Sequence, residues 1–99
     1  MIFLRQASVI MDNEPLRHFL SDPNAWNAVV QELRLTPRQQ DIVRLILRGK
    51  RNKEIAVELN IKIPTIQTQL DRVYRRHGLE DRVDLILTIF GLAWKLKTS

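Results

Sequence analysis

The sequence contains no cysteine among its 99 residues, which excludes disulfide bonds and thiolate metal sites. Glycine and proline are scarce, at three and four residues, as is typical of a helix-tolerant globular chain. Long apolar runs are also missing. The opening segment, MIFLRQASVIM, has an early arginine and apolar runs too short for a signal peptide or a membrane span. We therefore expect a soluble, cytoplasmic protein with no membrane partner.

The residue patterns that support catalysis are absent as well. The sequence has no glycine-rich phosphate loop, and no pair of carboxylates is accompanied by a base or a metal ligand. Its two histidines stand apart, so we interpret His18 as a surface residue and His77 as a half-buried residue beside Tyr74 at a helix end. The prediction is a protein that is not an enzyme and that needs no cofactor and no metal.

Positive charge is concentrated in the middle of the chain. The chain is 44% hydrophobic and 27% charged, and its length suits one small domain. Residues 34–76 carry eleven basic and four acidic side chains, a net charge of +7, whereas residues 1–33 and 77–99 carry −2 and 0. Such a distribution favours a surface that binds a polyanion, with an ordinary solvated helical surface as the alternative.

Helix boundary signals are clearest from Thr36 onward. The segment TPRQ, residues 36–39, combines an N-cap threonine, a proline at the first helical position and a glutamine that completes a capping box. It predicts a helix to Arg48 that ends at Gly49. Its buried stripe consists of Ile42, Val43, Ile46 and Leu47.

Two further helices follow across short connections. Asn52 is a candidate N-cap for the segment KEIAVEL, with Ile55, Ala56 and Leu59 facing inward, and Asn60 ends it. The next helix is predicted to begin at Pro64, to end at Gly78 and to bury Ile66, Leu70 and Val73. Only about three residues separate these two helices, and so short a connection forces them to cross sharply, as in a helix-turn-helix. The face opposite the buried stripe carries Gln67, Thr68, Asp71, Arg72 and Arg75.

A fourth helix, residues 81–97, is predicted with Asp81 as its cap and is apolar around almost its whole circumference. A domain this small cannot bury every face of such a helix, so we predict that it forms a homodimer interface. The predicted contacts are Leu85, Ile89, Leu92 and Trp94. A monomer with an exposed apolar helix is the alternative.

Residues 1–33 form a predicted extension that is partly helical. The segment DPNAWNAVVQEL, residues 22–33, predicts a capped helix with Trp26, Val29, Val30 and Leu33 inward, and DNEPLRHFL, residues 12–20, predicts a shorter one. Residues 1–11 are compatible with a strand, a helical turn or an arm. The extension either covers the remaining module, enlarges the dimer or is a remnant of a longer sensory architecture. The start at Met1 favours a stand-alone protein over a fragment.

The order and spacing of these residues resemble one family. The stretch Leu35 to Ile86 is similar to the DNA-binding domain of LuxR-type, or GerE-type, bacterial transcription regulators. The matching positions are Leu35-Thr36-Pro37-Arg38, Gly49, Asn52-Lys53-Glu54-Ile55-Ala56, Leu59, Ile61, Thr65-Ile66, Leu70, Gly78 and Arg82. The resemblance implies an all-α protein with a four-helix module over residues 34–99. It also implies a helix-turn-helix at residues 52–71, a reading helix at 64–77 and a last helix that dimerises.

The resemblance also implies which residues bind DNA. Positions matching Gln67, Thr68 and Asp71 face the bases, and those matching Asn52, Lys53 and Thr65 lie near phosphates. The charges at Lys50, Arg51, Arg72, Arg75 and Arg76 add candidate phosphate contacts. Asp71 either accepts from a cytosine amino group or pairs with Arg75 four residues later. The sequence departs from the family pattern at five positions. Family members often have an acidic residue where Gln39 stands, a lysine where Gln67 stands and a histidine where Gln69 stands. They usually have a leucine where His77 stands and a capping serine where Lys62 stands.

The predicted function is a DNA-binding transcription regulator that acts as a dimer on double-stranded DNA, with RNA polymerase left open as a further partner. Two alternatives remain. One is the promoter-binding region of a sigma-like factor, although such a region normally ends soon after its reading helix. The other is a helix-turn-helix interaction module that no longer binds DNA.

Overall fold

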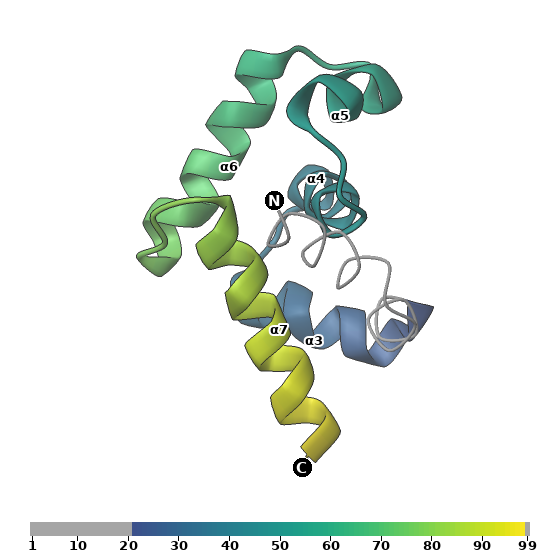
Figure 1. Ribbon diagram of the computed structural model, residues 1–99, viewed down its shortest axis with the longest axis vertical. Coiled ribbons are helices and arrows are strands. Elements are labelled where there is room, and N and C mark those ends of the chain that lie inside the picture. The colour runs from purple at the N-terminus through teal and green to yellow at the C-terminus, as the bar shows by residue number, and fades with distance from the viewer. Residues whose placement is uncertain (1–20, 99) are drawn as a thin grey trace, which may run out of the picture.

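The computed structural model describes residues 21–98, which form five helices and no strand (Figure 1). They are α3 (Pro23–Leu33), α4 (Pro37–Leu47), α5 (Asn52–Leu59), α6 (Ile63–His77) and α7 (Arg82–Thr98). The predicted all-α architecture is confirmed, including a helix in the N-terminal extension. The predictions for residues 1–11 and 12–20, with His18, lie outside the described residues.

The first described helix, α3, begins where the sequence predicted. The Asp22 side chain accepts a hydrogen bond of 2.9 Å from the backbone N–H of Asn24, and Pro23 occupies the first helical position. Trp26, Val29 and Leu33 are buried, and Val30 packs against the core at its edge. Arg44 of α4 lies 4.5 Å from the centroid of the Trp26 ring. The helix is therefore joined to α4 by packing and by a cation–π contact.

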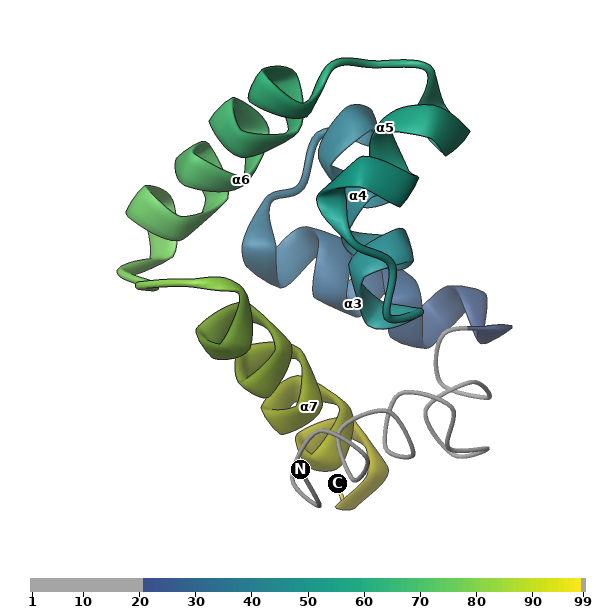
Figure 2. The same cartoon turned by 45° about the horizontal axis from the view of Figure 1, so that its top comes forward.

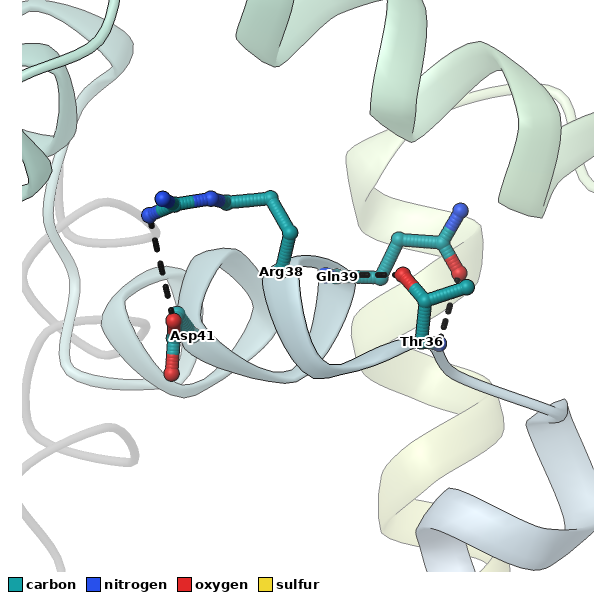
Figure 3. A network of polar contacts seen from close by, with 4 residues as sticks. All are labelled: Thr36, Arg38, Gln39 and Asp41. Atoms are coloured by element: carbon teal, nitrogen blue, oxygen red, sulfur yellow. Dashed lines mark hydrogen bonds and ion pairs between the residues drawn. The ribbon is translucent and has the colours of Figure 1, made fainter.

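The capping box of α4 is confirmed (Figure 3). The backbone N–H of Gln39 donates to the Thr36 hydroxyl at 3.3 Å, and the backbone N–H of Thr36 donates to Gln39 Oε1 at 3.1 Å. The helix ends at Leu47, and Gly49 has the predicted positive φ, +81°. The predicted stripe is buried, and Leu45 is buried with it.

The helix-turn-helix is formed by α5 and α6, with two boundaries one residue from their predicted positions. Arg51 is the N-cap of α5 and Asn52 its first residue, and the backbone N–H of Arg51 donates to Glu54 Oε1 at 2.9 Å. The Asn52 side-chain oxygen accepts from Arg82. Helix α6 begins at Ile63 rather than at Pro64, with Pro64 still inside its first turn. Asn60 and Gly78 end the two helices with φ of +54° and +64°.

All five helices contribute to one core. In Figures 1 and 2, α5 and α6 lie at one end, α3 and α7 lie at the other, and α4 occupies the space between them. Helix α6 contacts both α4 and α5, and α7 contacts α3. The core is made by Ile42, Val43, Ile46 and Leu47 of α4 with Ile55, Ile66, Val73, Leu85, Ile89 and the inward residues of α3. The N-terminal extension thus supplies part of the packing that supports α7.

Helix α7 has one buried and one exposed apolar face. The backbone N–H of Asp84 donates to Asp81 Oδ1 at 3.0 Å, which confirms the predicted cap. Leu85 and Ile89 are completely buried, whereas Leu87 remains 59% and Trp94 70% exposed. No helix within residues 21–98 is long and apolar enough to cross a membrane.

Candidate nucleic-acid interface

Helix α6 separates a buried apolar stripe from an exposed polar face. Ile66, Leu70 and Val73 are buried. The residues opposite them are exposed, as predicted: Gln67, Thr68, Asp71, Arg72 and Arg75. At 100° per residue, Thr68 and Arg75 lie at the crest of this face, and the other residues lie on its two flanks. The helix can therefore present polar side chains in three directions at once.

One flank of α6 borders a cleft shared with α5 and with the beginning of α7. The cleft is lined by Arg51, Asn52, Lys53, Gln67, Leu70, Asp71, Tyr74 and Arg82. Five of the predicted site residues therefore meet in one place: Arg51, Asn52, Lys53, Gln67 and Asp71. Three cations and one carboxylate face this cleft, so it carries an excess of positive charge that suits a polyanion.

Arg82 connects α7 to the helix-turn-helix. Its guanidinium donates to the side-chain oxygen of Asn52 and, at 3.4 Å, to the backbone carbonyl of Lys50. The family resemblance implies that Asn52 lies near a phosphate, and the structure adds that its side-chain oxygen accepts from Arg82. The sequence assigned no role to Arg82, although the position belongs to the residues that carry the family resemblance.

Tyr74 is one of the uncharged residues that line the cleft. Burial raises the pKa of the Tyr74 phenol above its usual value, and the neighbouring Arg82 guanidinium opposes this effect only in part. The phenol therefore stays neutral at physiological pH and adds no negative charge to the cleft. Asp71 supplies the one carboxylate among the lining residues.

The predicted ion pair between Asp71 and Arg75 is not formed. Both side chains are exposed and form no ion pair with each other, whereas Arg38 and Asp41 of α4 lie 3.9 Å apart and do form one (Figure 3). A spacing of four residues permits contact, but an exposed pair gains only about 0.3–0.5 kcal/mol, too little to fix two flexible side chains. Asp71 faces the cleft instead.

The other flank of α6 faces α4. Thr65 and Arg72 are exposed there, and the half-buried Gln69 lies between them. Gln69 Oε1 accepts a hydrogen bond of 3.1 Å from Nε2 of Gln39, which is only 2% exposed. Helix α6 is thus attached to the first turn of α4 by a pair of amides. Local sequence patterns could not reveal this contact, because the two residues are 30 positions apart.

The C-terminal end of α6 holds the end of α3. Arg76 donates to the backbone carbonyl of Arg34 at 2.7 Å, and His77 Nε2 lies 2.7 Å from the carbonyl of Leu33. The last carbonyls of a helix lack partners within it, so both side chains satisfy acceptors of α3. His77 is half-buried, as predicted. Arg76 was predicted to bind phosphate, and the structure adds that one of its guanidinium nitrogens donates to the end of α3 while the side chain remains exposed.

The remaining predicted residues lie in three places. Lys50 is exposed in the connection before α5. Leu85 and Ile89, predicted at a dimer interface, are buried within the protomer, and the half-buried Leu92 packs against the same core. These side chains face inward because α3 covers this side of α7, so the predicted interface was assigned to the wrong face at Leu85 and Ile89. Trp94 alone among the four is exposed.

The part of the chain that the structure describes contains no group of three or more His, Cys, Asp or Glu side chains arranged to hold a metal ion.

Residues 33–89 match the model of a family described as bacterial regulatory proteins, luxR family. A Mycobacterium bovis protein named as an HTH-type transcriptional regulator is 46% identical to this chain over 52 residues. The match covers 52% of this chain and 6% of that protein. The MalT transcriptional regulator of Vibrio campbellii is 29% identical over 88 residues, covering 89% of this chain and 10% of MalT. A Synechocystis response regulator is 26% identical over 73 residues, covering 72% of this chain and 32% of its own length. No solved structure matches the chain significantly.

Proposed function

Because the chain belongs to the LuxR family of bacterial regulatory proteins, we propose that it binds double-stranded DNA as a transcription regulator, with α6 in the major groove. The observation that carries this proposal is the exposed polar face of α6, which lies beside the positively charged cleft. A helix of 15 residues is about 22 Å long, and its diameter of about 10–12 Å fits a major groove about 12 Å wide.

Different residues contact the base edges and the phosphates. Gln67 and Thr68 offer hydrogen bonds to base edges, and a glutamine amide can pair with adenine N6 and N7. Asp71 can accept from a cytosine amino group, which the absence of its predicted ion pair leaves possible. Arg51, Lys53 and Arg72, with Lys50, Thr65 and Arg75, surround this region and contact phosphates.

We further propose that two copies associate through the exposed face of α7. Val83, Leu87 and Trp94 are exposed, with the half-buried Phe90 between the last two. Their spacing of four, three and four residues places them on one stripe opposite Leu85 and Ile89. A second copy could cover this stripe by two-fold symmetry, which would pair two reading helices on two half-sites.

Selection of bound duplexes from a random pool tests the DNA-binding proposal. We expect enrichment of two related half-sites in inverted orientation, with their spacing set by the dimer. Recovery of unenriched sequence together with salt-dependent binding would indicate non-specific association. No binding at low salt would favour a helix-turn-helix interaction module.

Replacing Gln67 with alanine is expected to remove discrimination at one base position of each half-site, a loss of about 1–3 kcal/mol for a bidentate contact. Affinity for duplexes altered at that position should equal affinity for the selected site. The measurement is fluorescence anisotropy against a panel of single-base variants of the selected duplex. An unchanged base preference would remove Gln67 from the base-reading set.

Replacing Arg72 with alanine is expected to weaken binding to every duplex alike and to lower the salt dependence, because one fewer phosphate is neutralised in each protomer. The slope of log K against log salt should become shallower by about 0.9 for each phosphate that is no longer neutralised. Lys95→Ala is the matched control, since it removes the same charge from the exposed surface of α7. Equal effects of both substitutions would indicate a general effect of net charge.

A further inference from the structure

The hydrogen bonds of Gln39 fix the orientation of two amide groups. Gln39 Oε1 accepts from the backbone N–H of Thr36 at 3.1 Å, and that N–H can only donate. The amide nitrogen of Gln39 must therefore point the other way, where it donates to Gln69 at 3.1 Å (Figure 3 shows the nitrogen directed away from Thr36). Gln69 consequently presents its oxygen to Gln39 and its amino group elsewhere.

The amino group of Gln69 remains available on the surface of α6. Its nitrogen donates to no acceptor among the described residues. It is also not one of the buried side-chain atoms that lack a partner, so it is accessible from outside the protein. Gln69 follows Thr65 by four residues and precedes Arg72 by three, so the three side chains share one flank of the helix. This flank therefore presents hydrogen-bond donors. The middle side chain, Gln69, is held by its hydrogen bond to Gln39 of α4.

We propose that Gln69 is a further DNA contact that donates its amide N–H to a backbone phosphate, and that the buried Gln39 is the positioning residue that keeps this amino group outward. The inference rests on the proposed DNA-binding function. Phosphate oxygens only accept hydrogen bonds, so an outward amino group matches them and an outward carbonyl oxygen does not. Gln39 thereby affects DNA binding without touching DNA.

The substitution Gln39→Glu tests the orientation directly. The new carboxylate can still accept from the Thr36 N–H, but it can only accept from Gln69. Gln69 must then turn its amino group inward and its oxygen toward the phosphate. We expect affinity for the selected duplex to fall about tenfold in fluorescence anisotropy, as for the removal of a hydrogen bond to a charged group. Gln69→Met removes the amino group at similar side-chain length and should weaken binding by a similar factor.

A double-mutant cycle separates this mechanism from a direct effect of the new charge. If Gln39→Glu acts through Gln69, adding it to Gln69→Met should cause no further decrease in affinity. An equal decrease in both backgrounds would overturn the proposal, because the carboxylate would then be acting by itself. Urea unfolding of each variant shows whether that variant is folded under the conditions in which its DNA affinity is measured. Side-chain amide NMR of the unsubstituted protein adds a second readout, in which duplex DNA should shift the Gln69 NH₂ signals strongly. Unshifted signals would contradict the contact.

Salt dependence distinguishes this inference from the proposed function. Gln69 is neutral, so Gln69→Met should leave the salt slope unchanged, whereas Arg72→Ala should reduce it. If the protein binds DNA with an Arg72-dependent slope while Gln39→Glu and Gln69→Met keep full affinity, this inference alone is wrong. If the unsubstituted protein binds no duplex, the proposed function fails and the inference fails with it.

Discussion

Replacing Leu85 with alanine is expected to lower the free energy of unfolding by about 2–5 kcal/mol, a large part of the stability of a small domain. Leu85 is 0% exposed and packs in the same core as α3 and α4. Removing its side chain leaves a cavity that the neighbouring helices can close only partly. Urea unfolding followed by circular dichroism measures the change.

Leu87 provides the matched control, because the same substitution two residues later falls on the exposed face of α7. Leu87 is 59% exposed, so Leu87→Ala should change the stability of the protomer by less than about 1 kcal/mol. Dimerisation adds stability that depends on protein concentration, so both variants should be unfolded at several concentrations. Equal losses of stability for the two variants at high dilution would contradict the assignment of the two faces.

Local chemistry explains why most helix boundaries could be predicted from the sequence. The capping box at Thr36 and Gln39 is contained within four residues, and the positive φ at Gly49, Asn60 and Gly78 depends on single residue types. The buried stripe of α6 follows from its period alone. Such features need no knowledge of the remaining chain, which is why they could be located to within about one residue.

The two faces of α7 could not be distinguished in this way. The helix is apolar around its circumference, so its periodicity gives no preferred direction. Which side faces the core depends on where α3 lies, and α3 belongs to the extension, whose position relative to the module the sequence left open. Leu85 and Ile89 were therefore predicted to contact a partner, although they pack inside the protomer.

Long-range contacts of the candidate DNA-binding residues could not be predicted from the sequence either. Arg76 and Arg72 look equivalent in the sequence, but only Arg76 meets a backbone carbonyl 42 positions away. The departures from the family pattern at Gln39 and Gln69 looked independent, yet the two side chains are hydrogen-bonded to each other. The family often has an acidic residue and a histidine at these two positions. This chain has two amides there, so the contact contains no titratable group.

The largest expected effect on DNA binding comes from Leu87→Glu, which places a charge in the proposed dimer interface. Burying an unpaired carboxylate is costly, so we expect a monomer in analytical ultracentrifugation. Two half-sites bound by one dimer gain from effective concentration, often by factors of about 100 to 10,000. Affinity for the selected two-site duplex should therefore fall at least about 100-fold, while affinity for a single half-site changes little.

Leu87→Lys separates loss of the dimer from a change in net charge. Glutamate repels phosphate and lysine attracts it, so a charge effect would change DNA affinity in opposite directions for the two variants. Loss of the dimer would weaken binding to the two-site duplex in both. If both variants stay dimeric, the interface lies elsewhere on the protein. If both are monomeric but keep full affinity for two half-sites, each copy of α6 binds its half-site independently and α7 has no role in DNA binding.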